Sequence, residues 1–271
     1  MKISSHSCFI AIFMLMHLTL SMQAQFFRPA QPKAAAAQIK SWLEKEMVYP
    51  EAELENRTRG VVKLEFIVDE QGNSSQFIVK ESVSPDIDKE AIRLVSKIVW
   101  DPATDGGQTV AAKHNYEIRF RPRQYNRIVR KRAYHQMDFP YLPVDTSGTI
   151  FNFAALDKRP EPQFEKENMS LNQYIRQELN YPSTALSRGI SGTVTLGYII
   201  EEHGLVSNIH LIHSVGGGCD NEAIRMLESI NWMPGIKDGK AVRSRSQIDI
   251  TFQLPDGSRQ QAVPSQQQSG L

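Results

Sequence analysis

The side chains best suited to chemistry in this chain of 271 residues include two histidines and a cysteine. His210 and His213 lie three residues apart in a segment of alternating apolar residues. On a strand this spacing points the two rings to opposite faces, which argues against a shared metal ion. Cys219 occupies the first position of an apolar helical stripe. There a thiol is expected to be a small core residue and not a nucleophile.

Two pairs of carboxylates with the same spacing are candidates for acid–base chemistry: Asp88 with Glu90, and Asp220 with Glu222. Each pair lies in the first turn of a predicted helix, where negative charge complements the helix dipole, and that explains it without catalysis. Gly216-Gly217-Gly218 lacks the Lys-Ser or Lys-Thr that follows in a phosphate-binding loop. We therefore expect no enzyme activity, no metal site and no cofactor.

A basic run is the remaining feature of the sequence that could bind a ligand. Seven Lys and Arg residues and no acid lie between Arg119 and Arg132, accompanied by Tyr125 and Tyr134. Such a run suits an anionic polymer, phospholipid head groups or nucleic acid. A solvated linker is the favoured interpretation, and export of the chain argues further against nucleic acid.

Composition excludes several classes of protein. Lys and Arg number 31 against 30 Asp and Glu, a formal charge of +1, so no global field gathers nucleic acid or an anionic membrane. The two cysteines are Cys8, inside an apolar leader, and Cys219. A disulfide framework and a Cys-rich zinc site are therefore excluded.

The first residues are typical of a targeting signal. Lys2 precedes the apolar run Phe9–Leu20, which is shorter than the roughly twenty residues that span a bilayer, and a cleavage site is predicted after Ala24. We expect residues 1–24 to be a signal peptide and the mature protein to lie in the periplasm. An uncleaved anchor in the inner membrane is the alternative, and membrane contact is expected only in that case.

The chain repeats itself with an offset of 132 residues, which aligns Tyr49-Pro50 with Tyr181-Pro182 without a gap. Across residues 49–120 and 181–252, 24 of the 72 aligned pairs are identical. Chance would give about four or five at ordinary residue frequencies. The sequence therefore contains two copies of one domain.

The residue pattern of each copy predicts a helix, a β-hairpin, a second helix and a last strand. Residues 62–68 alternate apolar and polar side chains, as a half-buried strand does, and a turn at Gly72 leads into a second strand. Ser84-Pro85 is typical of a helix start. The last strand of the first copy is Val110–Phe120, and the second copy repeats all of these elements.

Both copies share an ordered set of motifs: a Tyr-Pro entry, a Gly-(Val/Thr)-Val strand, an acidic turn with Gly72 or Gly204, a Ser-Val pair, Asp-x-Glu-Ala, Trp-x-Pro and a closing Phe. On these motifs each copy resembles the C-terminal domain of TonB family proteins. The resemblance implies the α+β class, with two tandem small domains, each a three-stranded antiparallel sheet packed on two helices. In that family the last strand, at a sheet edge, pairs with an extended peptide of outer-membrane transporters and couples them to an inner-membrane motor.

The chain also departs from the family pattern. A typical energy transducer has a membrane helix and a long Pro-rich spacer, whereas Pro29 and Pro32 are the only prolines before Gln38. A spacer this short reaches only tens of ångströms. We therefore favour a periplasmic peptide-binding protein over a transducer. The expected segments are a signal peptide at 1–24, domain 1 at 34–121, a basic, Pro-containing linker at 122–165, domain 2 at 166–254 and a disordered tail at 255–271.

The predicted site is the edge of each last strand, where unpaired backbone groups can accept an incoming strand. If Tyr116, Ile118 and Phe120 face the core, their neighbours face outward. The partner-binding side chains are then expected to be Lys113, Asn115, Glu117 and Arg119 in the first copy and Arg243, Arg245, Gln247 and Asp249 in the second. A TonB-dependent outer-membrane receptor is the expected partner.

Two alternatives remain open at this point. One is a membrane-anchored energy transducer, which requires the leader to be retained. The other is an envelope scaffold in which the sheet edges pair with each other or in a homodimer and leave no peptide site.

Overall fold

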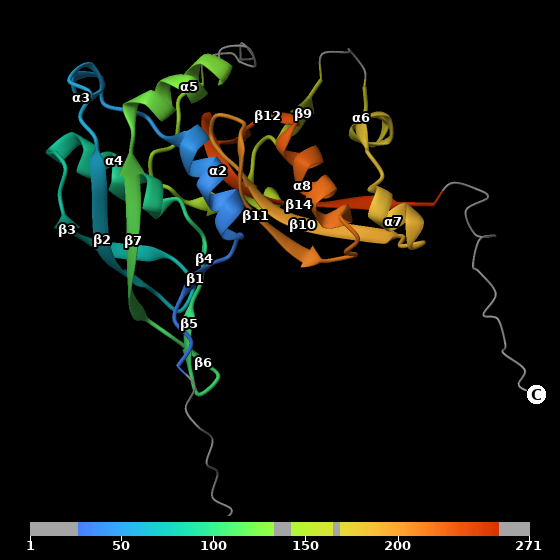
Figure 1. Cartoon of the computed structure of the whole chain (residues 1–271), viewed down its shortest axis with the longest axis horizontal. Helices are drawn as coiled ribbons and strands as arrows, with labels where there is room; N and C mark the ends of the chain where they lie inside the picture. Colours follow the sequence, from blue (N-terminus) through green and yellow to red (C-terminus); the bar gives the residue numbers. More distant parts are fainter. Residues whose placement is uncertain (1–26, 133–141, 165–168, 255–271) are drawn as a thin grey trace, which may run out of the picture.

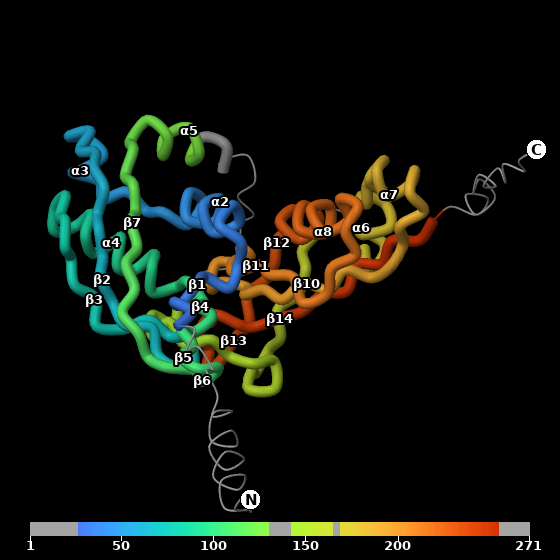
Figure 2. The backbone as a smooth tube through the Cα atoms, turned by 60° about the horizontal axis from the view of Figure 1, so that its bottom comes forward, coloured from blue at the N-terminus to red at the C-terminus, as the bar shows by residue number. Residues whose placement is uncertain are grey.

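A computed structural model describes residues 27–132, 142–164 and 169–254, and two α+β domains lie next to each other in it (Figures 1 and 2). Domain 1 occupies the blue-to-green part of the chain and domain 2 the yellow-to-red part. The expected signal peptide and the expected disordered tail lie outside the described residues.

Domain 1 is built on the antiparallel sheet β3-β2-β7. Its elements are β1 (Gln31–Pro32), α2 (Ala36–Glu46), α3 (Glu51–Glu55), β2 (Gly60–Val68), β3 (Ser74–Glu81), α4 (Pro85–Ser96), β4 (Trp100–Asp101), β5 (Ala103–Asp105), β6 (Gln108–Val110), β7 (Ala112–Phe120) and α5 (Pro122–Arg132). The last strand of the sheet, β7, lies at its edge, as expected.

Domain 2 repeats this plan with the sheet order β11-β10-β14-β13. Its elements are β8 (Ile150–Phe151), the 3-10 helix η1 (Phe153–Ala155), β9 (Glu161–Gln163), α6 (Leu171–Glu178), α7 (Ser183–Ser187), β10 (Gly192–Ile200), β11 (Val206–His213), α8 (Cys219–Glu228), β12 (Asn231–Met233), β13 (Gly235–Lys237) and β14 (Lys240–Phe252). The prediction of two tandem α+β domains is confirmed. Two short strands, β13 and β8, extend the expected three-stranded sheet.

The cores follow the alternation in the sequence. Val62, Leu64 and Phe66 of β2 are at most 1% exposed and belong to one cluster with Ile87 and Leu94 of α4. Burying the alternate residues of a strand against the apolar stripe of a helix removes both apolar faces from water. In domain 2, Cys219 is fully buried in the equivalent cluster, as expected for a core residue.

The hairpin turn of domain 1 requires glycine. Gly72 has a φ of 84°, and a Cβ atom there would lie 2.2 Å from the carbonyl oxygen of Trp100. The Trp100 amide in turn donates to the carbonyl of Gly72. The turn and the strand after α4 therefore meet backbone to backbone, and no side chain fits between them.

The acidic pairs hold backbone groups in both copies. Asp88 accepts hydrogen bonds from the Ser82 hydroxyl and the Val83 amide, and Glu90 accepts from the Val48 amide and from Arg93. The second copy repeats these contacts with Asp220 and Glu222 on Ser214, Val215, Asn180 and Arg225. These carboxylates have a structural role in addition to the dipole effect expected for them.

The segment expected to be a linker is partly folded. Pro122–Arg132 forms the helix α5, whereas the sequence interpretation placed this basic run in a solvated linker beyond a domain ending at residue 121. Pro122 stands at the first helical position, where proline costs no hydrogen bond, and this favours a helix start. Further along, β8 and β9 pair with β14 and β12 of domain 2. Domain 1 therefore includes α5.

The domains meet where α2 and the end of α4 contact β11. Gln38 and Trp42 of α2 lie around a cavity of about 10 Å³ with Val206 and Ile209 of β11. The side chain of Asn208 accepts from the Val99 amide at 2.8 Å and donates to the Lys97 carbonyl at 3.1 Å.

A cluster of buried charges lies in the same interface. Lys97 Nζ lies 2.9 Å from Glu46, 3.4 Å from Glu201 and 2.6 Å from Glu202. Arg243 lies 2.9 Å from Glu201. The charges are contributed by both domains, so their neutralisation depends on the domains staying together.

Candidate functional site

The edge of β7 is the best candidate site. β7 pairs with β2 over its whole length, from Gly60 opposite Phe120 to Val68 opposite Ala112. Among the residues that the structure describes, no strand pairs with the other side of β7. Its outer backbone groups are therefore open to an incoming strand.

The side chains of β7 follow the predicted parity. Those expected to face outward are exposed: Lys113, Asn115, Glu117 and Arg119. Ile118 and Phe120 are buried, with exposed fractions of 3% and 0%. Three of the exposed side chains form ion pairs, Lys113 with Glu65 at 3.3 Å and Arg119 with Glu117 at 3.6 Å.

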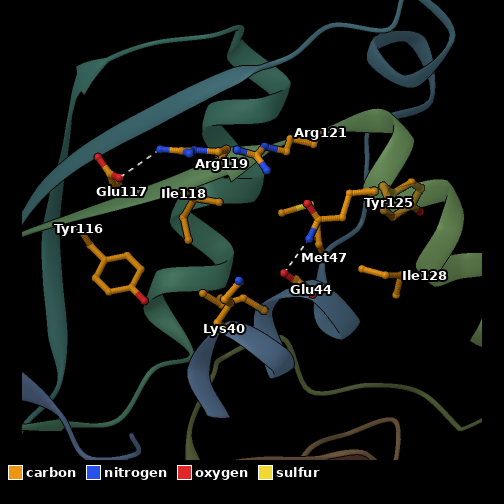
Figure 3. Close-up of a pocket in the computed structure, with 12 residues that line it drawn as sticks. Lys40, Glu44, Met47, Tyr116, Glu117, Ile118, Arg119, Arg121, Tyr125 and Ile128 are labelled. Carbon is orange, nitrogen blue, oxygen red and sulfur yellow. Dashed lines mark hydrogen bonds and ion pairs between the residues drawn. The ribbon is translucent and has the colours of Figure 1, made fainter. Parts of the chain in front are cut away.

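A groove of about 310 Å³ runs beside this edge, between α2, β7 and α5 (Figure 3). Leu43 and Met47 of α2, Tyr116 and Ile118 of β7 and Ile128 of α5 contribute its apolar lining. Polar and charged groups at its borders are Lys40, Glu44, Glu117, Arg119, Arg121 and Gln124. An apolar groove with polar borders next to free backbone groups suits a side chain of a peptide bound along β7.

Helix α5 forms one wall of the groove and is held by contacts with α2 and the segment after it. Gln124 donates to Glu44 at 2.6 Å, and the ring of Tyr125 lies 5.3 Å from that of Tyr49. The Tyr49 hydroxyl donates to the carbonyl of Thr58. Burial, together with the charge of Glu53, raises the pKa of Tyr49 to about 12, so this hydroxyl remains a donor near neutral pH.

Helix α5 was not predicted from the sequence, because its residues form a basic run. Tyr125 and Ile128 lie three residues apart and therefore on one helical face, and Pro122 precedes them at a favourable position. These were signals for an amphipathic helix. The arginines of the segment favoured a solvated linker instead, and the groove was not predicted.

The edge of β14 is open over only part of its length. Residues 240–242 pair with β13, and Arg243 and Ser244 pair with Ile150 and Phe151 of β8. The remaining outward-facing residues of the predicted site are exposed: Arg245, Gln247 and Asp249.

Arg243 does not face outward, so this part of the predicted site is wrong. Its side chain is 3% exposed and donates to Glu201 at 2.9 Å and to the Lys97 carbonyl at 2.8 Å. Burial alone would raise the pKa of Glu201, but the charges of Arg243 and Lys97 hold it below its usual value. The parity rule failed here because domain 1 and β8 cover this part of the outer face.

In residues 27–132, 142–164 and 169–254, no three His, Cys, Asp or Glu side chains are grouped so as to hold a metal ion. No helix in the same ranges has the length and apolar character that crossing a membrane requires.

In a comparison with known proteins, one family model matches this chain twice. The family model described as Gram-negative bacterial TonB protein C-terminal matches residues 45–122 and again residues 177–254. A solution NMR structure of the Pseudomonas aeruginosa TonB C-terminal domain is 24% identical, covering 35% of this chain and 85% of that chain with a TM-score of 0.25. No curated protein matches the chain. Because the two family matches together take in more than half of its residues, the chain belongs to the TonB C-terminal family and carries two tandem copies of that domain.

Proposed function

We propose that this protein binds extended peptide segments of outer-membrane transporters or other envelope partners by strand addition to β7, in TonB-dependent transport. The open edge of β7 beside an apolar groove carries this proposal. Family membership supports a role in such transport. The role is that of a binding protein and not of an enzyme.

Backbone and side chains have separate tasks in this binding mode. The free N–H and C=O groups of β7 hydrogen-bond to any extended chain, which gives affinity. Alternate side chains of that peptide point toward the groove or toward Lys113, Asn115, Glu117 and Arg119, and they give selectivity. The shorter open part of β14, with Arg245, Gln247 and Asp249, is proposed as a second and weaker edge.

The proposed location is the periplasm, after cleavage of the leader following Ala24. N-terminal sequencing of the protein from fractionated cells tests this directly. A start at Gln25 in the periplasmic fraction supports it. A start at Met1 in the inner-membrane fraction would instead establish the anchored transducer.

Peptide binding is tested by blocking the groove. Ile128→Trp places a larger ring in the groove, whereas Val129→Trp adds the same ring on the same helix at an exposed position that does not line it. We expect the Ile128 variant to lose at least tenfold in affinity for periplasmic peptides of outer-membrane transporters, and the Val129 variant to bind normally. Equal binding of a scrambled peptide by the unmodified protein would overturn the proposal.

A self-pairing scaffold remains the second candidate, because β8 already occupies part of the β14 edge within the same chain. In that case the β7 edge would be covered by another copy. Solution mass distinguishes the two candidates. A monomer with free β7 amides supports peptide binding, and a homodimer with protected β7 amides supports the scaffold.

A further inference from the structure

A hollow of about 1090 Å³ on domain 1 is lined by arginines from three separate parts of the chain. Two come from the turn between α3 and β2, one lies between β7 and α5, and two come from α5. They are Arg57, Arg59, Arg121, Arg123 and Arg127. Leu54, Pro122, Gln124 and Asn126 complete the lining. No acidic residue is part of it.

These arginines lack acidic partners. All five are exposed, and in the part of the chain that the structure describes none of them forms an ion pair. The contrast with Arg93 and Arg243, which contact carboxylates, shows that the chain does pair arginines elsewhere. Five guanidinium groups around one concavity repel each other, so an anion placed among them is attracted by all five.

The hollow continues the groove beside β7. Arg121 and Gln124 line both, so a chain leaving the carboxyl end of β7 passes directly from one to the other. A peptide that pairs with β7 and continues past Phe120 therefore places its flank beside the arginines. The two surfaces form one continuous path.

The second copy does not repeat three of these arginines. The positions equivalent to Arg57, Arg59 and Arg121 are Gly189, Ser191 and Gln253. The turn before β10 has one exposed arginine of its own, Arg188. Arg57, Arg59 and Arg121 are therefore not required by the fold that the two copies share.

We propose that the arginine hollow binds Asp and Glu side chains in the flank of the peptide whose central segment pairs with β7. This inference rests on the proposed function and adds the chemistry of the ligand, an acidic extended peptide. Guanidinium groups bind carboxylates through paired, charge-assisted hydrogen bonds. The continuity of the hollow with the groove favours a peptide flank over lipid phosphates, because a concave path admits a single chain more readily than a flat membrane surface.

The test uses the full chain and three synthetic peptides with the same central segment of alternating Val and Thr. One carries Asp-Asp-Glu before this segment, one carries it after, and one has Asn-Asn-Gln at both ends. Fluorescence anisotropy at low and near-physiological salt gives the affinities. We expect one acidic peptide to bind about tenfold more tightly than the neutral peptide, with a gain that shrinks as salt rises. The preferred end identifies the direction of the bound strand.

Variants assign the gain to the hollow. Arg59→Gln and Arg127→Gln should each reduce the affinity for the acidic peptide about threefold, the effect of an exposed ion pair, and leave the neutral peptide unchanged. Arg176→Gln and Arg188→Gln remove exposed arginines of domain 2 and should leave the affinities for both peptides unchanged. A fall for the neutral peptide as well would show that the arginines act on the fold or on the edge, and would overturn the inference.

The remaining outcomes separate this inference from the proposed function. Equal affinity for acidic and neutral peptides would overturn the acidic flank and leave strand addition intact. Failure of all three peptides to bind would overturn both. Vesicles of phosphatidylglycerol form a further arm: binding that Arg59→Gln and Arg127→Gln weaken, without any gain for acidic peptides, would assign the hollow to lipid phosphates instead.

Discussion

The two copies share one fold and differ in what lies against the edge of the last strand. In the first copy no strand of the described residues pairs with the outer edge of β7, and α5 forms a groove beside it. In the second copy the first residues of β14 are covered by β13 and β8. The hydrogen bonds of Asp88 and Glu90 recur in the second copy at Asp220 and Glu222. The strand pairings at the outer edge of β14 have no counterpart at β7 among the described residues. The two copies therefore share a fold but present different surfaces at this edge.

One pair of equivalent acidic residues also makes different contacts in the two copies. Asp69 of domain 1 accepts hydrogen bonds from the amides of Gln71 and Asn73 within its own turn. The equivalent residue in domain 2, Glu201, is fully buried and contacts Arg243 and Lys97 instead. The same position therefore holds a turn cap in one copy and a charge of the domain interface in the other.

The largest effect is expected from removing the buried arginine of this interface. Arg243→Met leaves the carboxylate of Glu201 buried with one counter-charge fewer, which should reduce the free energy of unfolding by about 3–5 kcal/mol. Arg245→Met, two residues along the same strand and exposed, should change it by no more than about 0.5 kcal/mol. Urea unfolding of the full chain measures both. Similar losses for the two variants would mean that the buried charges do not hold domain 2 in place.

A hairpin variant of domain 1 should have the next largest effect. Gly72→Ala brings a Cβ atom against the Trp100 carbonyl at a positive φ, so we expect a loss of about 2–4 kcal/mol. Gly107→Ala has a similar φ of 85° with open space around it and should cost about 1 kcal/mol. Thermal unfolding followed by circular dichroism compares them. If the two variants unfold at the same temperature, the close approach to Trp100 is not the reason for glycine at position 72.

The interface should also respond to pH through His203, whose equivalent in domain 1 is Gln71. His203 Nε2 lies 2.5 Å from Glu46. Burial alone would lower the pKa of His203, but the hydrogen bond and charge of Glu46 raise it above its usual value. The resulting stabilisation is fully present below the unfolded pKa of about 6.5 and is lost as pH rises through the raised folded pKa.

His203→Gln makes this position resemble the first copy and tests that dependence. The variant should be less stable than the unmodified protein at about pH 5.5, and the difference should shrink toward about pH 9. Its size should stay below about 1 kcal/mol, because the His203 side chain is 41% exposed. Melting temperatures across this range provide the measurement. A difference that grows with pH would contradict the assigned direction.

The sequence predicted most of the fold because its signals are local. The alternation in Val62–Val68 and the Ser84-Pro85 start of α4 correctly indicated a strand and a helix, and Ser84 accepts from the Ile87 amide as a capping residue does. The repeat doubled each of these signals. The parity of Lys113 to Arg119 followed from the same period of two.

What the sequence concealed depends on contacts between distant segments. Arg243 has the outward parity of its strand, and only the position of domain 1 beside it makes it buried. Helix α5 packs through Tyr125 and Ile128 while Arg123 and Arg127 are exposed, and a basic run alone does not indicate this arrangement. The arginine hollow brings together residues more than sixty positions apart in the sequence. A local sequence pattern does not predict such a contact.

The central claim, that the first copy binds peptide along β7, is tested most directly by amide hydrogen exchange of the full chain with and without a periplasmic transporter peptide. Within residues 113–120, the amides that donate to β2 should be protected throughout, because β7 pairs with β2 along its length. We predict that the alternate, outward-pointing amides of this segment exchange rapidly and become protected when the peptide is added, with a smaller change at the outward-pointing amides of residues 245–252. Protection of the outward-pointing β7 amides before any peptide is added, or protection confined to β14, would contradict the account.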